Sequence, residues 1–365
     1  MKKIANITWI TYHNYGTFLQ AYALQEYIKS LGYQNAILND ESIILNIFNW
    51  KLEIKKKFWQ MTKAYRMFAN SQKESDRLFE KFKSDHLVLE ENVTDIDYLN
   101  NEYDCFVCGS DQIWNPFSLR NPKAGFYYAD FAKKKKVAYA PSIGVSAIPF
   151  EYIELFTGLI QKFQFLSARE KQGKGIMEKL TGRKVNVVVD PTLLLGRDEW
   201  NNIVNSGVKD SKKYVLGYFL TPNPVYINAA KNYTRKMGYE FRMLFTDKSY
   251  VAVADNLITA GPVEFLQAIR DAQFVFTDSF HGSIFSSIFK VQFITFKRFG
   301  NTITNQNSRV ENLLRMMNID ERFIGVEDIK KIYSLDEIDF DKTWDRISSH
   351  IEDSKQYLLN ALRNE

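Results

Sequence analysis

The stretch Phe274–Ser283, with the sequence FVFTDSFHGS, joins an apolar strand directly to the start of a helix of small and apolar residues. In an open α/β sheet the carboxyl ends of the strands face the ligand crevice. A helix that begins there offers N–H groups and a partial positive charge to an anion, and His281 could add a proton or a hydrogen bond. The alternative is a capped helix start with a structural histidine, and spacing alone does not separate the two interpretations.

The first residues repeat this strand, loop and helix pattern. Ile4–Ile10 is a run of β-forming residues, Tyr12–Gly16 is a polar turn, and helical periodicity from Phe18 onward ends at Gly32. Strands and helices continue to alternate along the chain, which predicts a mostly parallel sheet. A second unit of the same kind begins near Lys212.

These patterns predict two Rossmann-like α/β domains that face a cleft. The tail has apolar residues along one face of a long helix, which predicts an amphipathic C-terminal helix. The expected boundaries are residues 1–205 for the N-terminal domain, 206–335 for the C-terminal domain, and 336–365 for the C-terminal helix.

Residues 45–100 interrupt the N-terminal pattern and are expected to form a helical insert. From 51 to 90 the segment is rich in Lys and Glu, contains no Gly or Pro, and is predicted to be helical throughout. If residues 51–68 are helical, their sequence predicts a basic amphipathic helix with exposed aromatic residues. Such a helix would lie in an anionic membrane surface, or it would pack its apolar face on the N-terminal domain. Both interpretations stay open.

The composition is that of an ordinary globular protein. The chain has 365 residues, of which 45% are hydrophobic and 25% charged, and its formal net charge is +5. These values exclude a disordered or fibrous chain, and the mild positive charge does not predict a nucleic-acid partner. No apolar run is long enough to span a membrane. We therefore expect a cytoplasmic protein, with peripheral contact at the inner face of the cell membrane if residues 51–68 bind lipid.

Several motifs of known chemistry are absent from the sequence. There is no phosphate-binding GxxxxGK[ST] loop, no GxGxxG, no HExxH and no serine nucleophile elbow, which argues against ATP hydrolysis, nicotinamide redox chemistry, zinc proteolysis and serine hydrolysis. The four histidines show no ligand spacing, so we expect no metal and no cofactor. Cys105 and Cys108 have redox spacing, but Cys-Phe-Val-Cys is predicted to be a buried strand whose two thiols point to opposite faces.

Two loops offer neutral or acidic polar groups. In the first βα turn, His13–Thr17 (HNYGT), Asn14 and Tyr15 suit a sugar better than a phosphate, although an ordinary capped turn explains the same pattern. Gly109–Gln112 (GSDQ) follows a predicted strand, and its Asp111 is a candidate base or ligand of a sugar hydroxyl.

Two further strand ends carry charged residues. Arg169 is placed where a guanidinium could hold a carboxylate or phosphate through two parallel hydrogen bonds. The alternative for Arg169 is a surface ion pair with Glu170. Asp190, in the sequence Asp-Pro-Thr, is interpreted as part of a turn that closes a strand before a linker.

Taken together, these motifs resemble the polysaccharide pyruvyl transferase family. They stand in order along the chain as His13–Gly16 (HNYG), Leu19–Leu24 (LQAYAL), Gly109–Asn115 (GSDQIWN), Ala140–Gly144 (APSIG), Ser167–Glu170 (SARE), Asp190–Leu194 (DPTLL) and Thr277–Gly282 (TDSFHG), followed by Arg309. The resemblance runs from about residue 4 to residue 320, and it does not cover the segment 45–100 or the tail beyond residue 335.

The resemblance implies a GT-B-like fold and phosphoenolpyruvate as co-substrate, with residues 1–205 as the acceptor-side domain and 206–335 as the donor-binding domain. The implied reaction places pyruvate on two hydroxyls of a sugar in a surface polysaccharide or its precursor, as a cyclic ketal, and releases phosphate. The sugar or oligosaccharide acceptor would be free or lipid-linked. His281 would be the general acid and Asp111 a second catalytic residue. The implied donor-binding residues are Arg169, Ser279, Phe280, His281, Gly282, Ser283 and Arg309, and the acceptor-binding residues are Asn14, Tyr15, Gly16, Asp111 and Gln112.

Two other hypotheses remain. A GT-B-type glycosyltransferase with a nucleotide-sugar donor would use the same two-domain shape and a histidine at a helix start. A sugar-binding protein with a decayed site is the non-enzymatic hypothesis, and the presence of both Arg169 and His281 argues against it.

Overall fold

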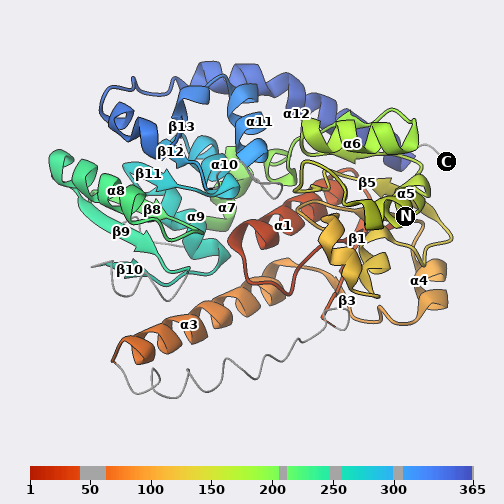
Figure 1. Cartoon of the computed structure of the whole chain (residues 1–365). Helices are drawn as coiled ribbons and strands as arrows, with labels where there is room; N and C mark the ends of the chain where they lie inside the picture. Colours follow the sequence, from red (N-terminus) through yellow and green to blue (C-terminus); the bar gives the residue numbers. More distant parts are fainter. Residues whose placement is uncertain (42–62, 205–211, 247–255, 299–306, 364–365) are drawn as a thin grey trace.

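The computed structural model describes residues 1–41, 63–204, 212–246, 256–298 and 307–363. Figure 1 shows two α/β units, with α1 lying centrally between them. The first unit is built on a five-stranded parallel sheet with the order β3-β2-β1-β4-β5. Its strands are β1 (Lys3–Ile7), β2 (Gln34–Leu38), β3 (Leu89–Glu90), β4 (Cys105–Cys108) and β5 (Lys135–Ala138), with a separate pair of β6 (Ser167–Ala168) and β7 (Asn186–Val187).

The second unit is built on a six-stranded parallel sheet with the order β10-β9-β8-β11-β12-β13. In each sheet the strand order reverses beside the first strand of the unit, which is where open α/β sheets bind ligands. The strands are β8 (Tyr214–Tyr218), β9 (Glu240–Leu244), β10 (Leu257–Ile258), β11 (Phe274–Thr277), β12 (Gln292–Phe296) and β13 (Phe323–Ile324).

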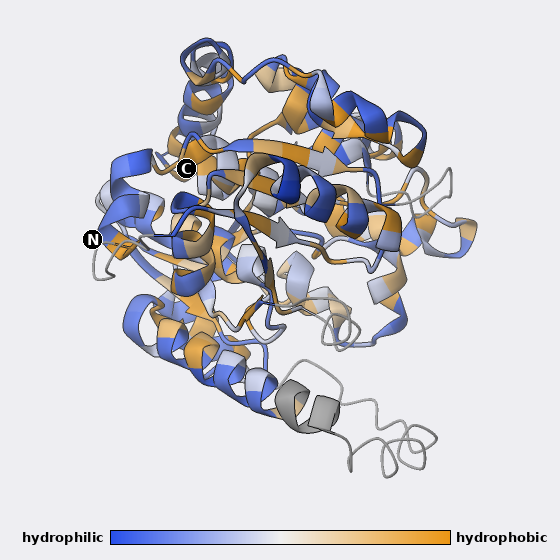
Figure 2. Cartoon of the chain, turned by 90° about the vertical axis from the view of Figure 1, so that its left-hand side faces the viewer, coloured by the Kyte–Doolittle hydropathy of each residue, from blue (hydrophilic) through white to orange (hydrophobic). Residues whose placement is uncertain are grey.

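Helices cover both sheets, and in Figure 2 the strands carry mostly hydrophobic residues while the outer helices mix hydrophilic and hydrophobic ones. The α-helices of the described residues are α1 (Tyr15–Ser30), α3 (Lys63–His86), α4 (Ile96–Glu102), α5 (Ile153–Gln161), α6 (Lys171–Thr181), α7 (Arg197–Val204), α8 (Pro224–Met237), α9 (Pro262–Arg270), α10 (Phe280–Ile288), α11 (Asn307–Met317) and α12 (Phe340–Arg363).

Helix α1 begins at Tyr15, three residues before the start expected from its periodicity. The reason is local: the side chain of Asn14 accepts a hydrogen bond from the N–H of Thr17 at 3.3 Å and so caps the first turn. The loop between β1 and α1 therefore ends at Asn14, and Tyr15 and Gly16 are held in helical geometry.

The segment expected to be a helical insert contains more than helices. The helix expected up to residue 90 ends at His86, and Leu89–Glu90 forms the edge strand β3 beside β2. Helix α3 packs on α1, with Phe79 and Phe18 in edge-to-face contact at 4.9 Å between ring centroids. Of the amphipathic pattern predicted over 51–68, residues 51–62 lie outside the described residues, and the backbone of residues 63–68 forms the start of α3. No helix in the described ranges is both long and apolar enough to cross a membrane.

Helix α12 connects the two units and runs along the top of Figure 1. Near its start, the indole of Trp344 donates to the carbonyl of Ser287 in the second unit at 3.1 Å. Near its end, the hydroxyl of Tyr357 donates to the carbonyl of Ala138 in the first unit at 2.9 Å. The C-terminal helix therefore holds the two domains together.

The prediction for the two cysteines is confirmed. Cys105 and Cys108 lie in strand β4, both buried, and they contribute to hydrophobic clusters on opposite faces of the sheet. Burial raises the pKa of the Cys105 thiol to about 12, which disfavours the thiolate that redox chemistry requires.

Candidate active site

Five charged or titratable residues from both domains converge at one place in the fold. Arg169 is at the centre, buried to 3% exposure. Its Nη1 is 2.6 Å from Oδ2 of Asp190, its Nη2 is 3.5 Å from Oδ1 of Asp111, and its guanidinium lies 4.7 Å from the ring centroid of Phe280. The alternative of a surface pair with Glu170 is wrong, because Glu170 is also buried and accepts hydrogen bonds from Ser142 and Ile143.

His281 enters this cluster from the second domain. It lies in the first turn of α10, and its Nε2 is 3.6 Å from Oδ2 of Asp190 in the first domain. On another side, the ring abuts Gly16 so closely that a Cβ at position 16 would lie 1.9 Å from Nδ1. His281 therefore sits in the interface between the domains, and only glycine fits at position 16.

Asp190 belongs to the site, although the sequence pattern indicated only a turn. Its Oδ1 accepts hydrogen bonds from the N–H and the hydroxyl of Thr192 and so caps the short 3₁₀ helix η5 (Pro191–Leu193). Its Oδ2 faces both Arg169 and His281. The turn interpretation is correct for one oxygen and incomplete for the other.

Asp111 is held at the end of β4 by contacts with both domains. Its backbone has a φ of +64°, a left-handed conformation that Asp adopts more readily than most residues. Its Oδ2 accepts from the hydroxyl of Thr17 on α1 at 2.7 Å. From α11, Nη1 of Arg309 approaches Oδ1 to 3.9 Å. The structure thus brings together Asp111, Arg169, His281 and Arg309, four of the residues selected from the sequence.

The charges in the cluster shift one another's pKa values. Burial alone would raise the pKa of Asp111, but Arg169, His281 and Arg309 hold it below the usual value. The pKa of Asp190 is lowered against the same burial effect, by His281 and Arg169. Burial and repulsion by Arg169 lower the pKa of Arg309 to about 10. Both carboxylates are therefore ionised, and both guanidinium groups are charged, at neutral pH.

The start of α10 differs in detail from the predicted anion cradle. The side chain of Ser279 already accepts a hydrogen bond from the N–H of Gly282, and its carbonyl accepts from the N–H of Ser283. A Cβ on Gly282 would lie 2.5 Å from the hydroxyl oxygen of Thr277 and 3.0 Å from the ring of Tyr218. Gly282 is thus required by packing, and its N–H serves the helix cap.

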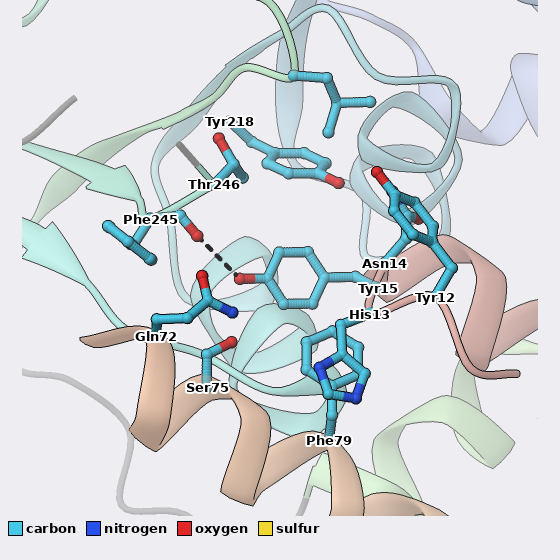
Figure 3. Close-up of a pocket in the computed structure, with 11 residues that line it drawn as sticks. Tyr12, His13, Asn14, Tyr15, Gln72, Ser75, Phe79, Tyr218, Phe245 and Thr246 are labelled. Atoms are coloured by element: carbon cyan, nitrogen blue, oxygen red, sulfur yellow. Dashed lines mark hydrogen bonds between the residues drawn. The ribbon is translucent and has the colours of Figure 1, made fainter. Parts of the chain in front are cut away.

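The residues predicted to bind the acceptor do not all lie together. Asn14 caps α1, and Tyr15 is 4% exposed with its hydroxyl donating to the carbonyl of Phe245 at 3.3 Å. Both line a pocket between the domains (Figure 3). Gln112 packs against the loop at Gly144: a Cβ added to Gly144 would lie 2.6 Å from Nε2 of Gln112. Among the described residues, no group of three His, Cys, Asp or Glu side chains is arranged to hold a metal ion.

The fold has two Rossmann-like domains in the arrangement called GT-B, and the charged cluster lies between them. The S. aureus protein MnaA, solved with UDP, superposes with a TM-score of 0.50 at 11% identity, over 100% of this chain and 96% of that one. A glycosyltransferase from Rickettsia africae has a TM-score of 0.48 at 10% identity, over 100% and 99% of the two chains. A UDP-GlcNAc 2-epimerase from Neisseria meningitidis has a TM-score of 0.45 at 11% identity, over 99% of each chain. At these identities the likeness concerns the fold alone.

Sequence comparison is more specific. The model of the polysaccharide pyruvyl transferase family matches residues 14–298, which is more than half of the chain, and the chain belongs to this family of transferases. No curated protein matches the chain in sequence.

Proposed function

We propose that the protein transfers the pyruvyl group of phosphoenolpyruvate onto two hydroxyls of a sugar in a surface polysaccharide or its precursor. The observation that carries the proposal is a set of buried donors: among the described residues, Nε and Nη2 of Arg169 and Nε2 of His281 have no hydrogen-bond partner. Although both residues lie near carboxylates, leaving these buried nitrogen atoms without a hydrogen bond is costly unless a ligand meets them. The carboxylate and phosphate of phosphoenolpyruvate are small anionic groups of the required kind.

The residues of the cluster would divide the chemistry as follows. His281 donates a proton to the methylene carbon of the donor, which becomes a methyl group while positive charge develops on the neighbouring carbon. One sugar hydroxyl adds to that carbon, and the second displaces the phosphate. Of the two hydroxyl protons, one restores His281 and the other leaves with phosphate. Burial of the site disfavours attack by water, which would yield free pyruvate.

The remaining charged residues would bind and orient. Arg169 and Arg309 hold the donor's carboxylate and phosphate, and Asp190 orients the His281 ring from 3.6 Å. Because its pKa is lowered, Asp111 is a weak base. We therefore assign Asp111 a hydrogen bond to the attacking hydroxyl. This scheme requires no metal or further cofactor.

The test measures phosphate release from phosphoenolpyruvate with a panel of sugar acceptors, and follows the ketal methyl group by NMR. His281→Gln should lose about 10²–10⁴-fold in rate, because glutamine keeps a hydrogen bond and cannot supply a proton. UDP-sugars are the contrasting donors, since the alternative function is sugar transfer from a nucleotide. Turnover of a UDP-sugar without turnover of phosphoenolpyruvate, or near-normal rates in His281→Gln, would contradict the proposal.

A further inference from the structure

The pocket in Figure 3 lies where three parts of the chain meet. Its lining comes from the first βα turn, from helix α3, and from the ends of strands β8 and β9 in the second domain: Tyr12, His13, Asn14, Tyr15, Gln72, Ser75, Phe79, Tyr218, Leu220, Phe245 and Thr246. The cavity volume is about 100 Å³, which corresponds to roughly three water molecules at ~30 Å³ each and is smaller than the cavity of about 150 Å³ that encloses a benzene molecule. The pocket can therefore enclose one edge of a sugar ring, with the rest of the ring outside it. We propose that this pocket binds one edge of an uncharged pyranose ring, the acceptor sugar, and that α3 selects it.

The chemistry of the lining favours a neutral ligand. None of its residues is Lys, Arg, Asp or Glu, and the polar groups are amides, hydroxyls and the imidazole of His13. Behind the imidazole lie Asp76 and Glu80 of α3, with carboxylate oxygens 2.8 Å and 3.4 Å from its nitrogens. These two carboxylates would repel an acidic sugar.

The floor of the pocket is a rigid aromatic column. The ring of Tyr15 stacks on Phe79 at 5.4 Å and on Phe265 at 4.7 Å between centroids, and His13 stacks on Phe79 at 4.8 Å. At the lip, the side chain of Tyr12 is 66% exposed. Both faces of the Tyr15 ring are covered within this column, so the exposed ring of Tyr12 is the apolar surface beside which a C–H face of a sugar could lie, with its hydroxyl edge towards the polar groups.

Helix α3 completes the pocket and is tied to both domains. In the first domain, Phe79 packs on Phe18, and in the second, the hydroxyl of Ser75 donates to the carbonyl of Ala260 at 2.7 Å. Figure 3 shows Gln72 and Ser75 pointing from α3 towards Tyr15. One N–H of Gln72 donates to Asp76 at 2.9 Å, which orients the amide so that its carbonyl oxygen can serve a sugar hydroxyl.

The pocket also adjoins the charged cluster. Asn14 and Tyr15 line the pocket, and the next residue, Gly16, abuts His281. On the other side, the Tyr218 ring packs against the backbone at Gly282. A sugar ring held here would direct its hydroxyls towards the donor site.

That the bound sugar is the acceptor rests on the proposed function, but the binding test does not depend on that function. Saturation-transfer NMR is recorded on the full chain with methyl glucoside, methyl galactoside, methyl N-acetylglucosaminide and methyl glucuronide, without donor. At least one neutral glycoside should bind, and the glucuronide should not. Gln72→Ala and Tyr12→Ala should weaken binding, Gln72→Ala by about tenfold, while Lys73→Ala, an exposed neighbour on α3, leaves it unchanged.

The outcomes separate the two proposals. Neutral-sugar binding that is lost in Gln72→Ala supports the pocket even if phosphoenolpyruvate is never turned over. Where turnover is seen, Gln72→Ala should raise KM for the sugar and leave KM for phosphoenolpyruvate unchanged. Sugar binding or KM unaffected by both Gln72→Ala and Tyr12→Ala, or binding of the glucuronide alone, would overturn the inference.

Discussion

At the scale of single residues, Asp190 has a structural contact on one carboxylate oxygen and site contacts on the other. Oδ1 caps η5 through Thr192, and Oδ2 pairs with Arg169 at 2.6 Å. Asparagine at this position would keep an acceptor for the cap and remove the charge. Because breaking a buried ion pair leaves its partner uncompensated, we expect Asp190→Asn to lower the free energy of unfolding by about 3 kcal/mol at pH 7.

The sign of the pH dependence follows from the lowered pKa of Asp190. A carboxyl with a depressed folded-state pKa stabilises the fold above its ordinary pKa of 3.8, and that stabilisation is lost as the pH falls towards the folded-state pKa. The difference between the wild type and Asp190→Asn should therefore be constant from pH 7 to 5 and shrink below about pH 4. Urea unfolding at pH 7, 5 and 3 measures it. A difference that stays the same at pH 3 would mean that the carboxylate charge contributes nothing.

At the scale of elements, the close packing of the N-terminus of α1 against the N-terminus of α10 depends on Gly16. It lies in the first turn of α1 and faces His281 in the first turn of α10. In Gly16→Ala the new methyl group must displace the imidazole from its place 3.6 Å from Asp190. We expect at least a tenfold fall in phosphate release, in line with the cost of misplacing a catalytic group.

The control for this prediction is Gly175→Ala. Gly175 lies inside α6, and a Cβ there would have no neighbour within 4 Å. Alanine in a helix interior should add roughly 0.5–1 kcal/mol of stability and leave activity unchanged. Wild-type turnover in Gly16→Ala would show that His281 does not need its present position.

Several elements of the fold, and part of the site, could be predicted from sequence. The alternation of strands and helices and the burial of strand Cys105–Cys108 follow from local pattern, which the structure confirms. Asp190 could not be assigned to the site, because its partners come from a different strand and from the other domain. A usable signal existed: like Asp111 and Arg169, it follows a strand at the carboxyl edge of a parallel arrangement. The edge strand β3 was missed because two residues carry no periodicity.

At the scale of the whole molecule, the charged cluster exists only while the two domains are held together. Asp111, Arg169 and Asp190 come from the first domain, and His281 and Arg309 from the second. Helix α12 bridges the domains and also contacts the residue next to Asp190. The N–H of Val189 donates to the hydroxyl of Ser354 on α12 at 2.9 Å. The C-terminal helix thus positions the end of strand β7, although the two segments are far apart in the sequence.

Ser354 tests this connection. Its side chain is fully buried, and Ser354→Ala would leave the N–H of Val189 without its acceptor, at a cost of about 1–3 kcal/mol. Because Asp190 follows directly, we expect kcat to fall along with Tm, while KM for the sugar stays constant. Ser354→Thr, which keeps the hydroxyl, should restore most of the rate, and Ser348→Ala, on the exposed side of α12, should change neither quantity. Thermal unfolding and steady-state kinetics at 20 °C, where all variants are folded, separate the two effects. If Ser354→Ala lowered Tm without any change in kcat, α12 would be a brace for the fold alone, with no part in positioning Asp190.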